Sequence, residues 1–327
     1  MKKLWISAAL ACGCLLSGQA QEQNDRKEAE GKAIIAIFSD LHSGFGSKNN
    51  DRGFTLDRSY LGYQYTLKNG LEIKAVMDVG QSDDVHDFER IAYIKNAQVT
   101  WKHDKLTLSG GLISTTQFKT QESFWGKRYV MRSFQDEYKF GSSADMGISA
   151  AYQFTPWFAA DVIVANGEGY KKLQINDGLQ YGAGVTFNPL KSLTLRAYAS
   201  YNEAPTDDLK GITNVSAFIG YAHSRFDIGA EYNYQTNAKN VKDQNQNGCS
   251  VYSTIQVNKN IDIFGRWDYL SSKDKWNEAK DGMAGMLGAE FKLGKYVKLA
   301  PNFRIWSPKS DDFGKSYYAY LNCSFSI

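Results

Sequence analysis

Several features are scarce in this sequence, and each scarcity argues against one class of protein. Only 5 prolines and 4 cysteines occur in 327 residues, which argues against a proline-rich or disulfide-stapled chain. No apolar stretch after residue 16 approaches 18 residues, so no membrane-spanning helix is expected there. The 38 basic and 35 acidic residues give a net charge of +3, which is too balanced for a nucleic-acid-binding protein. If this chain spans a membrane, it must do so with strands.

The N-terminus has the layout of a secretory signal peptide. Met1 is followed by Lys2 and Lys3, then by a mostly apolar run over 4–16 and by the small-residue site of 18–20. A charged start, a short apolar run and a cleavage site in this order predict that residues 1–20 are removed. A buried N-terminal helix is the alternative, and a lipoprotein signal at Cys12 is a weaker one.

The mature chain is nearly neutral and has two thiols. Removal of Lys2 and Lys3 lowers the net charge from +3 to +1. Cys249 and Cys323 lie in segments expected to be far apart, so no disulfide is predicted.

Apolar and polar residues alternate along almost the whole mature chain, as in the last twelve residues, SYYAYLNCSFSI. Period-two alternation is the pattern of a strand with one apolar and one polar face. It predicts sixteen strands, with an uncertainty of two either way. Their expected ranges are 33–43, 53–67, 71–79, 90–102, 105–113, 144–154, 157–166, 178–187, 193–201, 211–221, 225–235, 248–257, 260–270, 282–292, 296–306 and 315–327.

The connections between these strands alternate between short and long. Short turns such as Lys68-Asn69-Gly70 alternate with polar loops such as 80–89 and 236–247. Short turns at one rim and long loops at the other are typical of an outer-membrane β-barrel. An even strand number then places both termini on the periplasmic side.

Aromatic residues mark one end of seven of the eight strands that run to the short turns. The last apolar-face residues before the short turns are Tyr65, Trp101, Phe154, Phe187, Tyr221, Val257, Phe291 and Phe325. A membrane interface selects such a girdle, whereas a soluble all-β domain, the alternative, has no reason to form one.

The sequence therefore predicts an all-β, transmembrane, antiparallel up-and-down β-barrel over residues 33–327. Residues 21–32 form a short periplasmic segment before it. A barrel must close, so the last strand is expected to pair with the first.

The third long loop, 114–143, is the longest connection. It contains seven aromatic residues, three acidic residues and the cations Lys119, Lys127, Arg128, Arg132 and Lys139. So long a loop is usually functional or disordered, and this one is too aromatic for disorder. We expect it to fold into the lumen, with its aromatics on the wall and its cations facing the passage. The alternative is a solvated surface lid.

The inward parity of the strands carries charges of both signs, among them Arg58 and Arg90. Opposed charges across a pore produce a transverse field that favours polar solutes. The alternative for any one of them is a structural ion pair in the wall.

The stretches FWGKRYVMRSF, GSSADMGISAAYQF and VIVANGEGYK resemble the phosphate-selective porin family of the porin O and P type. This resemblance implies a sixteen-stranded, trimeric outer-membrane channel that binds small anions. It assigns anion binding to Lys119, Lys127, Arg128 and Arg132 of the loop and to wall arginines such as Arg58.

The function expected from the sequence is passive diffusion of small hydrophilic solutes, with a weak anion preference. Outer-membrane lipid and, during biogenesis, the barrel assembly machinery are the expected partners; no cofactor or metal is implied. One alternative is a non-conducting barrel used for adhesion or scaffolding.

A barrel hydrolase is the other alternative, but the common catalytic motifs are absent. Such an enzyme would use His42 or His86, assisted by Asp83, Asp84 or Asp87. The run QSDDVHDFE fits a solvated loop better than a weak divalent-cation site.

Overall fold

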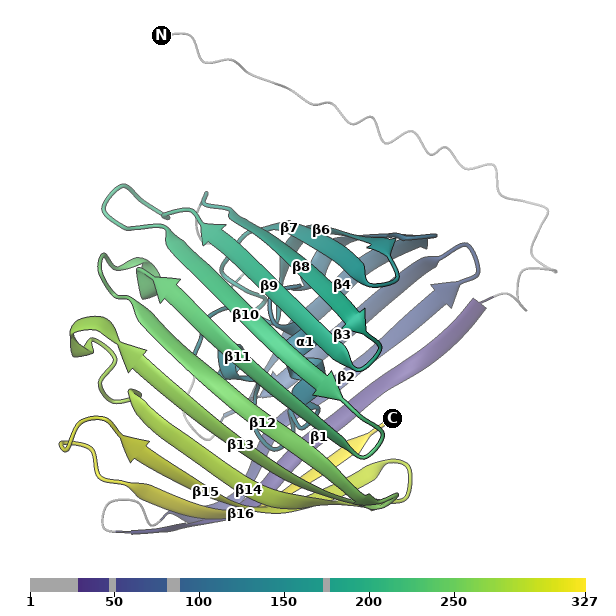
Figure 1. Cartoon of the computed structure of the whole chain (residues 1–327). Coiled ribbons are helices and arrows are strands. Elements are labelled where there is room, and N and C mark those ends of the chain that lie inside the picture. Colours follow the sequence, from purple (N-terminus) through teal and green to yellow (C-terminus); the bar gives the residue numbers. More distant parts are fainter. Residues whose placement is uncertain (1–28, 47–50, 81–88, 173–176) are drawn as a thin grey trace.

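The computed structural model describes residues 29–46, 51–80, 89–172 and 177–327. Sixteen antiparallel strands form one closed barrel, in which each strand pairs with its neighbours in sequence and β16 pairs with β1 (Figure 1). The predicted fold class and strand number are thus confirmed. The strands are β1 (Ala29–Phe45), β2 (Arg52–Leu67), β3 (Leu71–Gly80), β4 (Ile91–His103), β5 (Leu106–Ser114), β6 (Ala144–Thr155), β7 (Phe158–Ala165), β8 (Gln180–Leu190), β9 (Leu193–Asn202), β10 (Ile212–Ala222), β11 (Phe226–Thr236), β12 (Gln246–Asn258), β13 (Ile261–Ser272), β14 (Gly282–Leu293), β15 (Val297–Pro308) and β16 (Ser316–Ser326).

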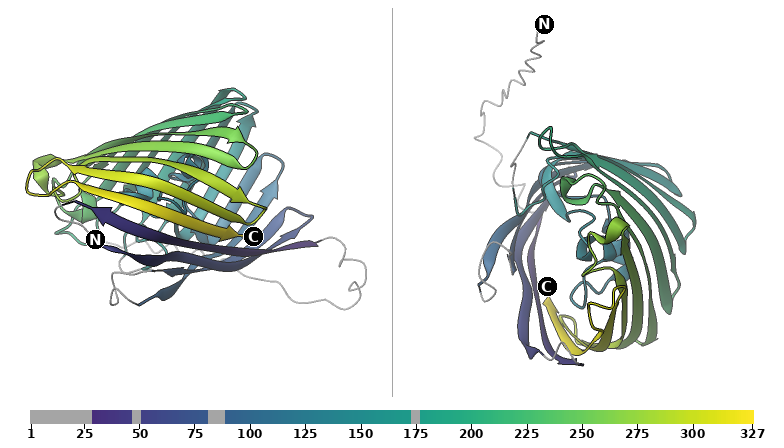
Figure 2. Two further views of the ribbon diagram at one scale, coloured as in Figure 1. Left: turned by 90° about the horizontal axis from the view of Figure 1, so that it is seen from below. Right: turned by 90° about the vertical axis from the view of Figure 1, so that its left-hand side faces the viewer.

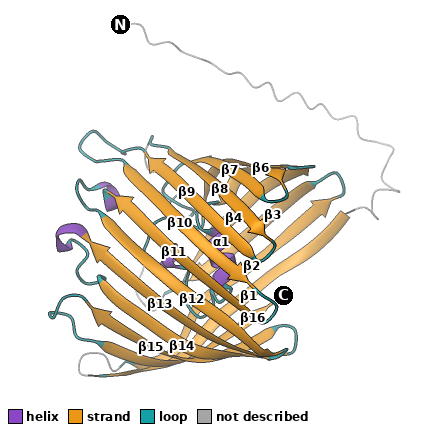
Figure 3. Cartoon of the chain, in the orientation of Figure 1, coloured by secondary structure: helices purple, strands orange, loops and turns teal. Residues whose placement is uncertain are grey.

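Helices are few and short in the described part of the chain (Figure 3). They are α1 (Lys119–Trp125), α2 (Phe134–Glu137) and the single-turn 3-10 helices η2 (Ala238–Asn240) and η3 (Lys273–Lys275). None of them combines the length and the hydrophobicity that a membrane-spanning helix needs. The region assigned to the signal peptide, residues 1–20, lies outside the described residues.

The barrel closes through its terminal strands, as expected. Ile37 of β1 lies opposite Phe325 of β16, and the pairing continues to Phe45 and Tyr317. Since every strand has a partner on both sides, the barrel has no free edge whose backbone groups would lack hydrogen bonds.

The two faces of each strand differ as the alternation predicted. In β3, Ile73 and Met77 are 47% and 46% exposed on the outside, whereas Val76 and Asp78, on the other face, are 5% and 2% exposed on the inside. The outer surface is therefore apolar, and the inner surface carries polar and charged groups. Most residues of the predicted aromatic girdle are exposed large hydrophobics: Tyr65, Trp101, Phe154, Phe187, Val257 and Phe291.

Short turns gather at one rim and longer connections at the other, where η2 and η3 also lie (Figures 1 and 3). Gly70 closes the turn between β2 and β3 at a φ of +84°. A Cβ there would lie 1.9 Å from the carbonyl oxygen of Lys102, so the turn requires glycine.

Two of the register shifts among the described strands add a charged residue to the barrel interior. Opposite the Phe38–Ser39 step of β1, Asp57 is an extra residue of β2. Opposite the Val76–Met77 step of β3, Lys95 is an extra residue of β4. A bulge turns the extra side chain out of the regular order. Both charged residues line cavities inside the barrel.

Candidate functional site in the barrel lumen

The segment between β5 and β6, residues 115–143, lies within the ring of strands (Figure 2, right). It contains α1 and α2, and Gly126 ends α1 in the left-handed conformation at a φ of 61°. The segment is closed at its base by a hydrogen bond of 3.1 Å from the Thr115 amide to the carbonyl of Ser143.

Aromatic side chains fix this interior segment to the wall. Trp125 is 1% exposed, and its ring centroid lies 5.6 Å from that of Tyr252 on β12 and 6.1 Å from that of Phe264 on β13. Phe134 is fully buried in a second cluster with Leu270 of β13. The inner face thus carries apolar residues where the segment packs against it.

Inward hydrogen bonds from the wall satisfy backbone carbonyls of the segment. Tyr252 donates to Gln121 over 2.9 Å, and Arg304 of β15 donates to Val130 over 2.8 Å. Further wall donors are Arg196 of β9 to Thr116, Arg266 of β13 to Arg132 and Asn322 of β16 to Tyr129. Because the segment starts at β5 and is attached as far away as β13 and β15, it crosses the interior of the barrel.

Lys127 lies on the wall, 5% exposed. Its Nζ is 4.0 Å from Glu290 of β14 and 5.5 Å from the centroid of the Phe264 ring. Glu290 also accepts a 2.8 Å hydrogen bond from the hydroxyl of Tyr129. Burial lowers the pKa of Lys127, and the Glu290 carboxylate opposes this effect. Lys127 therefore holds the segment in place.

Arg128 is engaged in a separate network, which reaches β2. It forms ion pairs with Asp136 and, at 3.2 Å, with Glu122, and its Nε lies 3.3 Å from the hydroxyl of Tyr60 on β2. Burial alone would raise the pKa of Asp136, but the Arg128 guanidinium lowers it below the ordinary value. The charge of Arg128 is thus largely neutralised.

The other cations expected at the site have different surroundings. Lys119 and Arg132 are exposed, and neither has an ion pair within 4.0 Å among the described residues. Lys139 is exposed at a φ of 60°. Arg58 is buried and pairs with Asp78 at 2.7 Å. Arg90 precedes β4 and donates to the carbonyl of Leu56 over 3.3 Å.

Two cavities border the interior segment on different sides. Arg58, Arg128 and Arg132 meet in one of about 380 Å³, where they face a group of carboxylates: Asp40, Asp51, Asp57 and Glu137. Lys119 lies in the other, of about 200 Å³, together with Lys74 and Lys95. Arg90 and Lys139 line neither of these two cavities.

Several residues of the candidate site could not be predicted from the alternation of apolar and polar residues. Lys95 and Asp57 enter the lumen only because they are bulge residues, which period two cannot register. The docking wall has a signal that could have been used, because Phe218, Phe264 and Met286 are large apolar residues at inward positions. Such residues would be poorly placed on a wall facing only water.

Of the two histidines considered for a barrel hydrolase, His42 lies within the described residues and His86 does not. His42 forms a 2.7 Å hydrogen bond with Asp40 and lines the larger of the two cavities. His86 and its neighbours Asp83, Asp84 and Asp87 lie outside the described residues. Within the described ranges, no group of three or more His, Cys, Asp or Glu side chains is arranged to hold a metal ion.

The fold is similar to that of solved bacterial outer-membrane proteins. An anion-selective porin from Comamonas acidovorans matches with a TM-score of 0.67 and 13% identity, covering 92% of this chain and 100% of its own. OprB of Pseudomonas putida matches with a TM-score of 0.69 and 11% identity, covering 92% and 94%. The outer-membrane channel DcaP of Acinetobacter baumannii matches with 0.65 and 11%, covering 92% and 98%. No family model and no curated relative matches the sequence.

Proposed function

We propose that this chain is an outer-membrane channel for passive diffusion of small hydrophilic solutes, with the interior segment 115–143 as its constriction. The observation that carries the proposal is the crossing of a closed, charge-lined barrel by one anchored segment. Such a segment would narrow a wide barrel without closing it, and the cavities beside the segment would be part of the polar space that remains.

The lining of the smaller cavity supports a weak preference for anions. Lys74, Lys95 and Lys119 line it, and the one acidic residue there, Glu122, is paired with Arg128. Three ammonium groups around one space raise the local concentration of small anions such as phosphate. The anion-selective porin among the similar structures and the resemblance to phosphate-selective porins support this preference.

The apolar outer surface with its aromatic girdle fits the outer membrane, with the short-turn rim at the periplasmic side. We propose that the chain is exported by its signal peptide, inserted by the barrel assembly machinery and assembled as a homotrimer. Cross-linking of the protein extracted in mild detergent should give a band of three chains; a band of one chain only would remove the trimer.

The channel is tested by single-channel recording of the refolded protein in a planar bilayer, with the reversal potential measured in a KCl gradient. We expect discrete current steps and a reversal on the anion side. Replacing Lys74, Lys95 and Lys119 together by Gln should move the reversal toward the cation side. Lys259→Gln, in the exposed turn between β12 and β13, is the matched control and should leave it unchanged.

A second candidate is a non-conducting barrel for adhesion or scaffolding, because the aromatic clusters and wall hydrogen bonds hold the segment firmly across the lumen. Protein shown to be folded and inserted but electrically silent would favour this candidate over the channel.

A further inference from the structure

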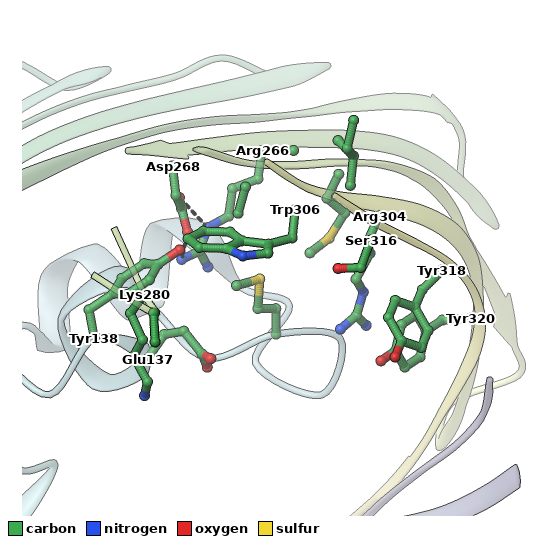
Figure 4. Close-up of a pocket in the computed structure, with 16 residues that line it drawn as sticks. Glu137, Tyr138, Arg266, Asp268, Lys280, Arg304, Trp306, Ser316, Tyr318 and Tyr320 are labelled. Atoms are coloured by element: carbon green, nitrogen blue, oxygen red, sulfur yellow. Dashed lines mark hydrogen bonds and ion pairs between the residues drawn. The ribbon is translucent and has the colours of Figure 1, made fainter. Parts of the chain in front are cut away.

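A third cavity of about 270 Å³ lies between the interior segment and the wall formed by β13–β16 (Figure 4). It shares Met131, Glu137, Arg304 and Tyr320 with the cavity of about 380 Å³, so the two are adjoining parts of one chamber. Each part is close to the lower end of the ~300–1,000 Å³ range of small-molecule sites. We call this space the aromatic chamber.

A cation and an aromatic ring form a flat platform in the middle of the aromatic chamber. The guanidinium carbon of Arg304 lies 3.8 Å from the centroid of the Tyr320 ring. Arg304 is held there by hydrogen bonds of 2.8 Å to Asn302, Asn322 and the carbonyl of Val130.

Further aromatic side chains surround this platform. Tyr318 lies 5.6 Å from Tyr320, measured between ring centroids, and Trp306 lines the same cavity (Figure 4). Flat π-surfaces and a stacked guanidinium favour a flat ring as the guest. The adjacent methionines Met131 and Met286 are flexible enough to adapt to its shape.

Charges of both signs in the aromatic chamber lack an ion pair among the described residues, and two of them come from the interior segment. Arg132 and Glu137, both from the interior segment, line the larger cavity. Neither side chain has an ion pair within 4.0 Å among the described residues, including one with the other. Of the other arginines in this cavity, Arg58 and Arg128 pair with Asp78 and Asp136, whereas Arg304 is held by neutral acceptors. A pure anion would meet the carboxylates of the lining, and a pure cation would meet the arginines.

We propose that the aromatic chamber binds a small zwitterion that carries an aromatic ring, the chemistry of a free aromatic amino acid. The ring stacks beside the Arg304–Tyr320 platform, the carboxylate meets Arg132 and the ammonium meets Glu137. This inference rests on the proposed channel function, since it names a class of solute that would pause on its way through the lumen.

The test is equilibrium dialysis of radiolabelled L-phenylalanine against the folded protein in detergent micelles, with empty micelles as the blank. Three competitors each lack one feature: L-alanine has no ring, benzoate has no ammonium and phenethylamine has no carboxylate. We expect saturable binding of phenylalanine, at least about tenfold tighter than that of any competitor. Equal binding of benzoate, or of alanine, would overturn the proposal.

Variants locate the bound ring and charges. Tyr320→Leu and the double change Arg132→Gln with Glu137→Gln should each weaken binding about tenfold or more, whereas Tyr320→Phe, which keeps the ring, should bind normally. Tyr93→Leu is the matched control, because Tyr93 of β4 packs against Tyr170, outside the aromatic chamber. Binding lost in Tyr93→Leu, or retained in Tyr320→Leu, would contradict the assignment.

Dialysis needs no ionic current, so its result is separate from that of the channel test. Binding by a protein that carries no current would support the aromatic chamber and remove the channel. Current without phenylalanine binding would support the channel function and overturn the proposal that the aromatic chamber binds an aromatic amino acid.

Discussion

The interior segment has two kinds of cation, and the structure gives them opposite surroundings. Lys127 and Arg128 are buried or half-buried against carboxylates, whereas Lys119 and Arg132 are exposed to the lumen without an ion pair among the described residues. The residue type does not decide this difference. It depends on whether the fold places an acidic side chain within reach. We call the cations that are paired with carboxylates anchored, and we expect them to control the position of the segment. We call the cations without an ion pair free, and we expect them to control which solutes pass the segment.

The largest effect is expected from the anchor itself, Trp125. Trp125→Ala removes a buried indole from the wall, which costs about 3–5 kcal/mol for a core tryptophan. Since the strands keep all their pairings, the barrel should persist while the segment detaches. Trypsin cleavage after the lysines and arginines of the segment should become fast, and single-channel conductance should rise.

Trp101→Ala is the control for the loss of a tryptophan, because Trp101 is 39% exposed on the outer surface. Unchanged proteolysis and conductance in Trp125→Ala would mean that the segment does not depend on this anchor.

The anchored cation Lys127 should matter for stability rather than for selectivity. Lys127→Met leaves Glu290 in the wall with Tyr129 and with Lys298, whose Nζ is 3.6 Å away. Removing one partner of a buried charged pair costs about 1–3 kcal/mol here, because these contacts remain. Trypsin cleavage of the segment should therefore accelerate, while the reversal potential stays near that of the wild type.

The double variant Lys127→Met with Glu290→Gln tests the cause. If the pair is the anchor, the two changes together should cost less than the sum of their separate costs. Strict additivity would show that Lys127 acts only by packing on Phe264.

The ion pair between Arg128 and Asp136 should give the segment an acid limit. The pKa of Asp136 lies below its ordinary value of 3.8 in the folded protein, so a segment that has lost its folded shape, and with it this ion pair, binds more protons. Docking is therefore fully supported above pH ~4 and weakens as pH falls through the lowered pKa. In the wild type, the conductance should become larger or noisier as the pH is lowered below ~4.

Asp136→Asn separates this carboxylate from the other acidic groups of the lumen. This variant should be looser at neutral pH and should lose most of the acid-induced change. An identical pH profile in both proteins would place the acid sensitivity elsewhere.

The barrel was predictable because each of its residues is sorted by a strong local contrast. An apolar outer face and a polar inner face require period two on every strand, and Ile73, Val76, Met77 and Asp78 show this sorting within six residues. The bulge residues Asp57 and Lys95 were not predictable in this way, because an extra residue depends on the pairing with a neighbouring strand.

The same limit applies to the candidate site. The sequence identified the loop and its cations, but it could not separate Lys127 from Lys119. The partner that buries Lys127 is Glu290, which is more than 160 positions away in the sequence and is met only through the folded wall. Short helices such as α2, with 4 residues, also lack enough periodicity to be recognised.

The smallest effect is expected from a single free cation. Lys119→Gln removes one exposed ammonium from the cavity of about 200 Å³ that Lys74 and Lys95 also line, and it leaves the anchors intact. One charge at about 4 Å in water is worth about 1 kcal/mol, or about a fivefold change in local anion concentration. The anion-to-cation permeability ratio should fall by at most this factor, and 1 M KCl should shrink the difference because salt screens exposed charges. If Lys119→Gln instead accelerated trypsin cleavage and left the reversal potential unchanged, Lys119 would belong with the anchors, and the division of the segment into anchoring and free cations would fail.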